Sequence, residues 1–354
     1  MRKNKKTKIF RFVYIGLTVI IIALIGFFTV DAEEMRSAFK MLNVKLLFTC
    51  FGCLFMYWIT DALLLNDITS YMYKRESFFQ SLKVGIIGLY YGALTPFATG
   101  GQPMQVVYMR RSKMPVGTAT CIVGVKFVVY ELSLCALFIT AMVIHGNEFY
   151  TQYNANYMFW FALLGFVVNA SAVLFIILTF INKNLVYKIG TALIRFFAKI
   201  KIIRKKEKAL HGFEKTIEEY HAAADYIAHH KLRAVGSFFI SVINLIFFFA
   251  IPYFIYCAFG SPGGRNIADI IALQSFLYIA ISFFPTPGSA GAAEGGFHAI
   301  FAALFGSGAV FAPMLIWRFL TYYLVLIVGS IVVVLDEVFA LRRAGRVSTE
   351  DLNE

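Results

Sequence analysis

Apolar residues in this chain gather into long continuous blocks. A transmembrane helix needs about 20 mostly apolar residues, and at least seven blocks approach that length. The blocks cover residues 12–30, 44–65, a segment that begins near Leu82, 116–144, 157–181, 235–259, 267–284 and 313–339. The first block follows a basic start without a small-residue cleavage site, which favours a retained helix over a signal peptide. The pattern predicts an all-α polytopic membrane helix bundle.

Two segments between apolar blocks, residues 93–103 and 284–296, are too rich in Gly and Pro for continuous helix. Six of the eight prolines lie in or beside them. Non-helical backbone at membrane depth persists only where protein buries it or where it lines a wet cavity. We therefore predict two re-entrant hairpins, at about residues 82–110 and 267–305.

Charge placement supports this topology. Only 15% of residues are charged and 59% are hydrophobic, which excludes a secreted, disordered or nucleic-acid-binding protein. If both hairpins re-enter, one from each side, 27 of the 33 Lys and Arg residues fall on the same side as the two termini and four on the other. Basic residues mark the cytoplasmic side. The placement of the basic residues therefore predicts cytoplasmic termini.

The predicted organisation has four parts. They are an N-terminal membrane half at 1–182, a basic linker at 183–233, a C-terminal membrane half at 234–340 and a cytoplasmic tail at 341–354. The start of the linker has apolar residues at helical spacing among basic ones. This indicates either an amphipathic helix on an anionic leaflet or a solvated linker. Its histidines, expected to be solvated, are His211, His221, His229 and His230.

The two broken segments resemble each other. Thr95-Pro96 precedes Gly100 at the same spacing as Thr286-Pro287 precedes Gly291. Entered from opposite sides, such segments indicate an inverted repeat, an arrangement that places transport sites at the bilayer midplane. The alternative is coincidence, because Gly and Pro recur wherever helices break.

A charge within the hydrocarbon region costs about 2.5–3.5 kcal/mol on insertion scales. The candidates in this chain are Asp61, Lys126, Glu131, Asp269, Glu294 and Arg318. Asp61 and Asp269 lie near predicted span ends, where they are expected to reach the interface. Lys126 and Glu131 are five residues apart, a spacing that does not stack them on one helix face. Their partners are therefore expected on other helices.

Glu294 lies in the second broken segment, and Arg318 lies inside the last span. Arg318 is expected either to pair with Glu294 or to hold a lipid phosphate through its bidentate fork. The pair also suits a purely structural role. Glycines in both broken segments allow backbone N–H groups to face an anion or helices to pack closely. They are Gly100, Gly101, Gly288 and Gly291.

Motifs of soluble enzymes are absent from the sequence, including the Walker loop, GxSxG and HExxH. This excludes ATP hydrolysis by this chain, and nothing identifies a cofactor or a metal site. The five cysteines all lie in apolar segments. The Cys50-x-x-Cys53 pair falls within a predicted helix, so we interpret it as helix packing.

Both broken segments resemble signatures of a known family. Residues 95–105, followed by Tyr108-Met-Arg-Arg111, resemble the first signature of the lysylphosphatidylglycerol synthase transmembrane region. Residues 285–297, followed by Trp317-Arg318 and Tyr322-Tyr323, resemble the second. This region forms the flippase-like N-terminal domain of the multiple peptide resistance factor and also occurs as stand-alone membrane proteins. The resemblance covers nearly the whole chain.

The resemblance implies a bundle with two re-entrant hairpins. In full-length resistance factors this domain is taken to move aminoacylated phosphatidylglycerol between leaflets, while a separate cytoplasmic domain transfers lysine from tRNA. The sequence shows no such domain, so we expect no lysyltransferase activity from this chain alone. Many members have Glu at the position of Gln102, and Arg and Asp at those of Lys126 and Glu131. Because of these differences, the resemblance does not identify the lipid headgroup.

We therefore expect a lipid flippase of the bacterial plasma membrane. Lys126 and Arg318 would neutralise a phosphate, while Glu131 and Glu294 would meet a cationic headgroup or balance the basic pair. The predicted substrate-binding residues are Gly100, Gly101, Gln102, Lys126, Glu131, Gly288, Gly291, Glu294 and Arg318. The substrate is an anionic or aminoacylated phospholipid, including phosphatidylglycerol, or a polyprenyl-phosphate lipid. The rival interpretations are a phosphatidylglycerol lysyltransferase linked to antibiotic resistance and a membrane partner of a separate lipid synthase. The oligomeric state is open.

Overall fold

Helices make up nearly all of the described structure. The computed structural model describes residues 42–155, 157–199, 206–229, 231–260, 264–305 and 310–350, and no strand occurs within these ranges. Five helices there are long and apolar enough to cross a membrane: Val44–Met72, Val116–Tyr153, Met158–Ile181, Leu232–Ala258 and Phe311–Phe339. The protein is thus an all-α, multi-pass membrane protein, which confirms the predicted fold class. The predicted first span at residues 12–30 lies outside the described residues.

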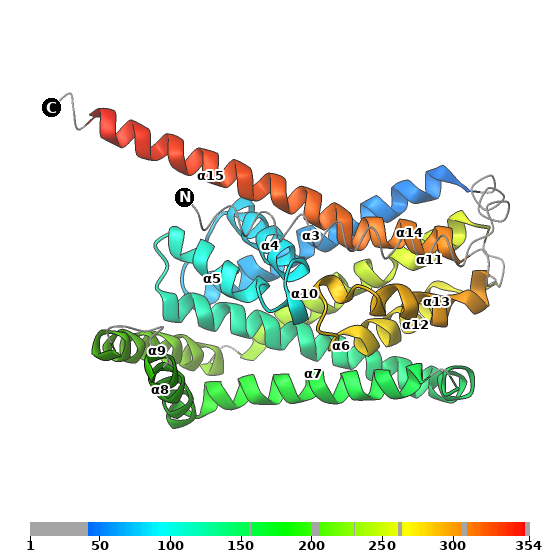
Figure 1. Cartoon of the computed structure of the whole chain (residues 1–354), viewed down its shortest axis with the longest axis horizontal. Coiled ribbons are helices and arrows are strands. Elements are labelled where there is room, and N and C mark those ends of the chain that lie inside the picture. The colour runs from blue at the N-terminus through cyan, green and yellow to red at the C-terminus, as the bar shows by residue number, and fades with distance from the viewer. Residues whose placement is uncertain are drawn as a thin grey trace.

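The long helices run side by side along the long axis of the molecule (Figure 1). They are α3 (Val44–Met72), α6 (Val116–Tyr153), α7 (Met158–Ile181), α10 (Lys231–Phe249) with α11 (Ile251–Ala258), and α14 (Phe311–Arg318) with α15 (Leu324–Glu350). The break between α10 and α11 falls where Pro252 occupies the first turn of α11, a position that tolerates a residue without an N–H donor. α14 joins α15 through a π-helical turn, Phe319–Tyr323.

Two helical hairpins occupy the broken segments. In hairpin 1, α4 (Phe78–Ala93) and α5 (Gly101–Arg111) flank a short 3₁₀ turn, η1 (Pro96–Ala98). In hairpin 2, α12 (Ile267–Ile281) and α13 (Ala292–Phe305) flank η2 (Pro287–Ser289).

The four hairpin arms have 16, 11, 15 and 14 residues. A helix needs about 20 residues to cross a bilayer, so no arm spans one alone. The hairpins start at opposite ends of the bundle, and η1 contacts η2 between them (Figure 1).

The same order of elements occurs twice along the chain. A long helix, a hairpin and another long helix appear first as α3, hairpin 1 and α6. They appear again as α10–α11, hairpin 2 and α14–α15. α3 packs against α6 in the first set, and α11 packs against α14 in the second. This order extends the similarity of the two broken segments to whole structural units.

Apolar side chains both fill the interior and cover part of the surface. Aromatic residues of α12 and α13, such as Phe276, Phe297 and Phe301, are fully buried. On α7, by contrast, Trp160, Val167 and Leu174 and other apolar residues are exposed. Exposed aliphatic and aromatic residues along a span-length helix are expected where that helix faces lipid.

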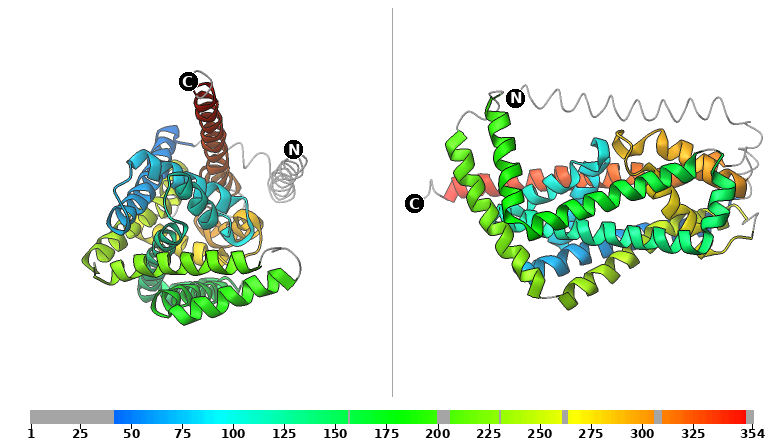
Figure 2. Two further views of the ribbon diagram at one scale, coloured as in Figure 1. Left: turned by 90° about the vertical axis from the view of Figure 1, so that its left-hand side faces the viewer. Right: turned by 90° about the horizontal axis from the view of Figure 1, so that it is seen from below.

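The linker at residues 183–233 is helical over most of its length, with α8 (Lys183–Lys199) and α9 (Lys206–His229). Both helices lie at one end of the bundle and cross the direction of the long helices (Figure 2). α9 packs against the bundle, where its Glu219 accepts a hydrogen bond from the Gly117 N–H, at 3.0 Å, in the first turn of α6.

One smaller expectation, the solvation of the linker histidines, needs correction. His221 is buried against the bundle rather than solvated, whereas the side chain of His211 is 92% exposed. The side chain of His229 and all of His230 lie outside the described residues. α15 continues as helix to Glu350, beyond the start of the predicted tail at 341–354.

Candidate functional site

The two hairpin tips share one unusual backbone conformation. Thr95 and Thr286 are both extended, with φ, ψ of −120°, 146° and −103°, 141°. Two residues later, Phe97 (54°, 20°) and Gly288 (59°, 21°) both enter the left-handed region. The sequence similarity of the tips therefore reflects a common three-dimensional turn.

Gly288 is required for a contact as well as for its backbone angle. Phe97 adopts the same conformation with a side chain, and that side chain is 54% exposed. A Cβ atom on Gly288 would instead collide with the ring of Tyr322. The backbone of the second tip thus packs directly against the Tyr322 ring, with no room for a side chain at position 288.

A series of glycine-to-alanine variants tests this assignment. Gly288→Ala is expected to destabilise the protein most, because the left-handed conformation costs about 1–2 kcal/mol for a residue with a Cβ and the Tyr322 ring must also move. Gly291→Ala carries only the conformational cost, since its φ is +85° and no atom lies within 4 Å of the added Cβ. Gly295→Ala on α13 has neither problem and serves as the control. Thermal unfolding in detergent measures all three, and equal midpoints for Gly288→Ala and Gly295→Ala would contradict the assignment.

Arg318 and Glu294 form a buried ion pair beside the second tip. The guanidinium Nε lies 2.6 Å from Glu294 Oε1, and both side chains are at least 94% buried. The second carboxylate oxygen accepts the Gly291 N–H at 2.7 Å. Arg318 Nη2 donates to the Gly288 carbonyl oxygen at 2.7 Å. These bonds tie α14, α13 and the tip into one unit, and the pairing with Glu294 is the first of the two alternatives predicted for Arg318.

Tyr322 connects this unit to hairpin 1. The Arg318 guanidinium stacks over the Tyr322 ring at 4.4 Å, a favourable cation–π arrangement. The Tyr322 hydroxyl donates to the Ala93 carbonyl oxygen at the end of α4, at 3.4 Å. From the sequence, Tyr322 was named only as part of the second family signature and was not among the predicted site residues. Its position four residues after Arg318 was the available signal, because residues at that spacing are neighbours on a helix.

A second buried ion pair lies beside hairpin 1. Lys126 Nζ on α6 is 2.7 Å from Asp61 Oδ1 and donates to Oδ2 at 2.8 Å. The expectation that Lys126 finds its partner on another helix is confirmed, but the placement of Asp61 at the interface is wrong. Asp61 is buried in α3 against α4, where a Cβ on Gly85 would contact Oδ2 at 2.6 Å. Asp269, in contrast, does lie in the first turn of α12, where it completes a capping box with Asn266.

The remaining predicted residues lie apart from these pairs. The Gly100 N–H donates to Thr95 Oγ1 at 2.7 Å. Gly101 packs against the backbone of Gly88 on α4. Gln102 is half-buried in the first turn of α5. Glu131 is buried on α6, and its Oε2 atom has no hydrogen-bond partner among the described residues.

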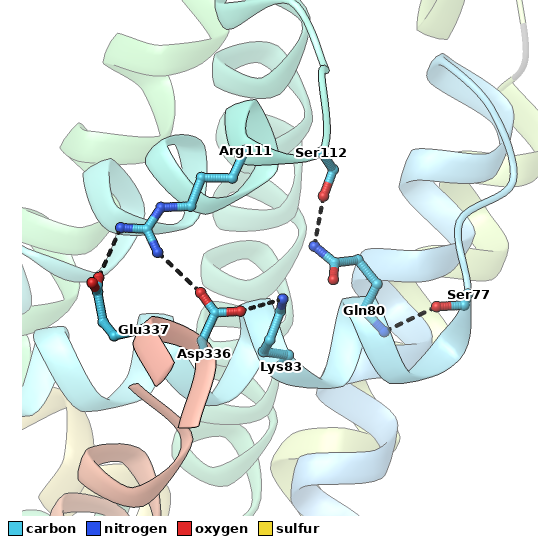
Figure 3. A network of polar contacts seen from close by, with 7 residues as sticks. All are labelled: Ser77, Gln80, Lys83, Arg111, Ser112, Asp336 and Glu337. Atoms are coloured by element: carbon cyan, nitrogen blue, oxygen red, sulfur yellow. Dashed lines mark hydrogen bonds and ion pairs between the residues drawn. The ribbon is translucent and has the colours of Figure 1, made fainter. Parts of the chain in front are cut away.

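Further from the tips, charged groups join the open end of hairpin 1 to α15 (Figure 3). Asp336 accepts Lys83 at 2.7 Å and Arg111 at 2.9 Å. Arg111 also reaches Glu337 at 3.0 Å. Because these side chains are partly exposed, each bond contributes little stability alone. Together they fix the position of both hairpin arms relative to α15.

Comparison with known proteins identifies the family of this chain. A family model described as the lysylphosphatidylglycerol synthase TM region matches residues 13–329. The chain is also similar to a UPF0104 membrane protein of Archaeoglobus fulgidus, with 24% identity over 327 residues. That match covers 90% of this chain and 94% of the relative. The matched region contains both hairpins and both buried ion pairs, so the chain belongs to the lysylphosphatidylglycerol synthase transmembrane region family.

Proposed function

We propose that this protein moves an anionic or aminoacylated phospholipid between the leaflets of a bacterial plasma membrane. The observation that carries the proposal is the contact between two oppositely oriented hairpin tips beside the buried Arg318. Broken helices that meet inside a membrane protein are a common way to hold a polar substrate at the midplane. A buried ionisable residue at such a place is a candidate for substrate contact. Family membership supports a role connected with membrane lipids.

In this proposal the two buried cations receive the lipid phosphate in turn. Arg318 is the first candidate, because its planar fork suits phosphate and its carboxylate partner lies on the hairpin itself. Lys126 is the second, because its partner Asp61 packs against hairpin 1. Phosphate binding then requires each cation to exchange a carboxylate for a phosphate oxygen. At Arg318 the exchange would release hairpin 2 from α14, and at Lys126 it would separate α6 from α3, against which α4 of hairpin 1 packs.

The proposed orientation in the membrane follows from charge. The end of the bundle that holds the open end of hairpin 1 also carries Lys83, Arg110 and Arg111 together with the basic helix α8. We assign this end to the cytoplasm by the positive-inside rule. Hairpin 1 then enters from the cytoplasm and hairpin 2 from outside.

Lipid transfer in proteoliposomes tests the function. The purified chain is offered labelled phosphatidylglycerol, its lysyl derivative and a polyprenyl-phosphate sugar, and the movement of each between leaflets is timed. We expect one of them to move. We expect Arg318→Lys to slow that movement about tenfold, because an ammonium retains the charge but loses the bidentate fork. Glu148→Gln is the control, since it breaks an ion pair with Arg265 at the far end of the bundle (2.6 Å).

The outcomes separate the rival functions. Failure of the wild-type protein to move any of these lipids contradicts the proposal. Formation of lysyl-phosphatidylglycerol from lysyl-tRNA by the purified chain would instead establish the transferase. Transfer that needs a co-purified lipid synthase would establish the partner role.

A further inference from the structure

Glu131 differs from every other carboxylate discussed so far. Asp61 and Glu294 each contact a cation directly, whereas Glu131 Oε2 is buried without a hydrogen-bond partner in the described structure. Its residue exposure is only 8%. Lys126, the cation on the same helix, is engaged by Asp61. An ionised carboxylate is costly in such surroundings, and protonation removes the cost.

A strip of buried polar groups leads away from Glu131. Tyr130 directly precedes Glu131 on α6, and its hydroxyl group shares a hydrogen bond of 3.0 Å with the Tyr278 hydroxyl group, in which either atom can donate. Gln274 lies one turn before Tyr278 on α12, is fully buried and has no partner for either amide atom among the described residues. Buried polar atoms of this kind typically bind internal water. Hydroxyl groups and water together form routes for protons.

The strip continues toward the first ion pair. Tyr57 lies one turn before Asp61 on α3. Its ring contacts the ring of Phe248, which in turn contacts the ring of Tyr278, with centroid separations of 4.8 and 5.8 Å. The Tyr57 carbonyl oxygen accepts the side-chain amide of Asn244 at 2.7 Å, and the Asn244 Oδ1 atom is buried without a partner within the described ranges. α3, α6, α10 and α12 thus all contribute polar groups to one buried region.

The helices around α6 bring few other titratable groups to this region. Cys135 lies four residues after Glu131 on α6, one helical turn away. α7 has no titratable side chain between Met158 and Ile181. Charged residues on the other helices packed against α6 contact its two ends or lie near their own helix ends. Glu219 on α9 bonds to Gly117 in the first turn of α6, and Asp269 in the first turn of α12 lies 3.7 Å from His145. Arg110 and Arg111 end α5, and Lys231 and Arg233 begin α10.

We propose that Glu131 is a proton-binding site that couples lipid movement to proton movement. The proposal rests on the proposed function and adds its energy source. Tyr278 lies in the last turn of α12, directly before the tip of hairpin 2. A shift of this hairpin therefore moves Tyr278 relative to Tyr130 and Glu131. In one arrangement the carboxylate takes a proton from water through the strip and becomes the neutral acid. In the other the O–H bond breaks and the proton returns to water.

Infrared difference spectroscopy tests proton binding without any lipid assay. The purified protein is titrated in lipid nanodiscs, and the carbonyl band of protonated carboxylic acids is followed against pH. Other carboxyl groups add to this band at low pH, so we follow the component that the wild type and the control Glu148→Gln share. We expect this component to disappear as pH rises and to be missing in Glu131→Gln. An identical titration in Glu131→Gln and wild type would overturn the proposal. If Glu131→Gln does not fold, Glu131→Asp is used, and it should shift the band.

Proteoliposomes with a pH difference across the membrane test the coupling. We expect a gradient of one sign to accelerate wild-type lipid transfer severalfold and the opposite gradient to slow it. Glu131→Gln should lose this response, and Glu131→Asp should retain it. If the rate of wild-type lipid transfer does not depend on the pH gradient, the proposed coupling is overturned but the proposed function is not. Absence of transfer of every lipid defeats the proposed function, and the infrared titration still decides whether Glu131 binds a proton.

Discussion

Arg318→Ala is expected to lower the free energy of unfolding by about 3–5 kcal/mol, because removal of one partner leaves a buried charge unpaired. The stranded group is the Glu294 carboxylate, which is only 1% exposed. The Gly288 carbonyl also loses its charged donor. Denaturant unfolding in detergent micelles measures the loss.

A double variant separates structure from function at this pair. Glu294→Gln combined with Arg318→Met removes both charges and should recover most of the lost stability, since a buried pair replaced by neutral groups is often close to neutral in free energy. A stable double variant that no longer moves lipid would show that Arg318 serves transport. A stable double variant that transfers lipid at the wild-type rate would show that the pair has only a structural role, which would contradict the proposed role of Arg318 in transport.

Lys126→Met is expected to cause a loss of similar size, about 3–5 kcal/mol, by stranding the Asp61 carboxylate between α3, α4 and α6. The matched control is Lys83→Met. Lys83 also pairs with an aspartate at 2.7 Å, but its side chain is 33% exposed. A partly exposed pair contributes at most about 1 kcal/mol.

The comparison uses the same unfolding measurement for both lysines. Asp61→Asn added to Lys126→Met should restore most of the stability by removing the stranded charge. Equal effects of Lys126→Met and Lys83→Met would show that burial does not govern the strength of the first pair.

Much of this architecture follows from local chemistry. Apolar blocks predict the long helices because the required length depends on bilayer thickness alone. Gly and Pro in the broken segments predict the hairpins, and the bounds of hairpin 2 agree with the predicted 267–305. Hairpin 1 begins four residues earlier than predicted, at Phe78, where Ser77 caps α4 through a hydrogen bond to the Gln80 N–H. The similarity of the two tips was also visible in the sequence.

Other features depended on which helices became neighbours. Hydropathy placed Asp61 near a span end. A hydropathy pattern indicates how far a residue lies from the end of its own helix, but it does not indicate whether the residue is buried between helices. The contact of α9 with α6 was hidden because α9 is polar enough to resemble a solvated segment. The extension of the last helix to Glu350 was missed because the apolar pattern stops near residue 339, whereas a helix can continue beyond it.

The sequence by itself determined the membrane environment, the long helices, the two helix breaks and the few charged residues within apolar segments that needed partners. Tertiary structure alone decided how those charges are used. It joined Lys126 to Asp61 across α6 and α3, placed Tyr322 between the two tips and left Glu131 Oε2 buried without a hydrogen-bond partner among the described residues. The physical reason is that insertion into a bilayer depends on composition along a segment. The state of a buried charge instead depends on atoms within a few ångströms, which residues far apart in the chain supply.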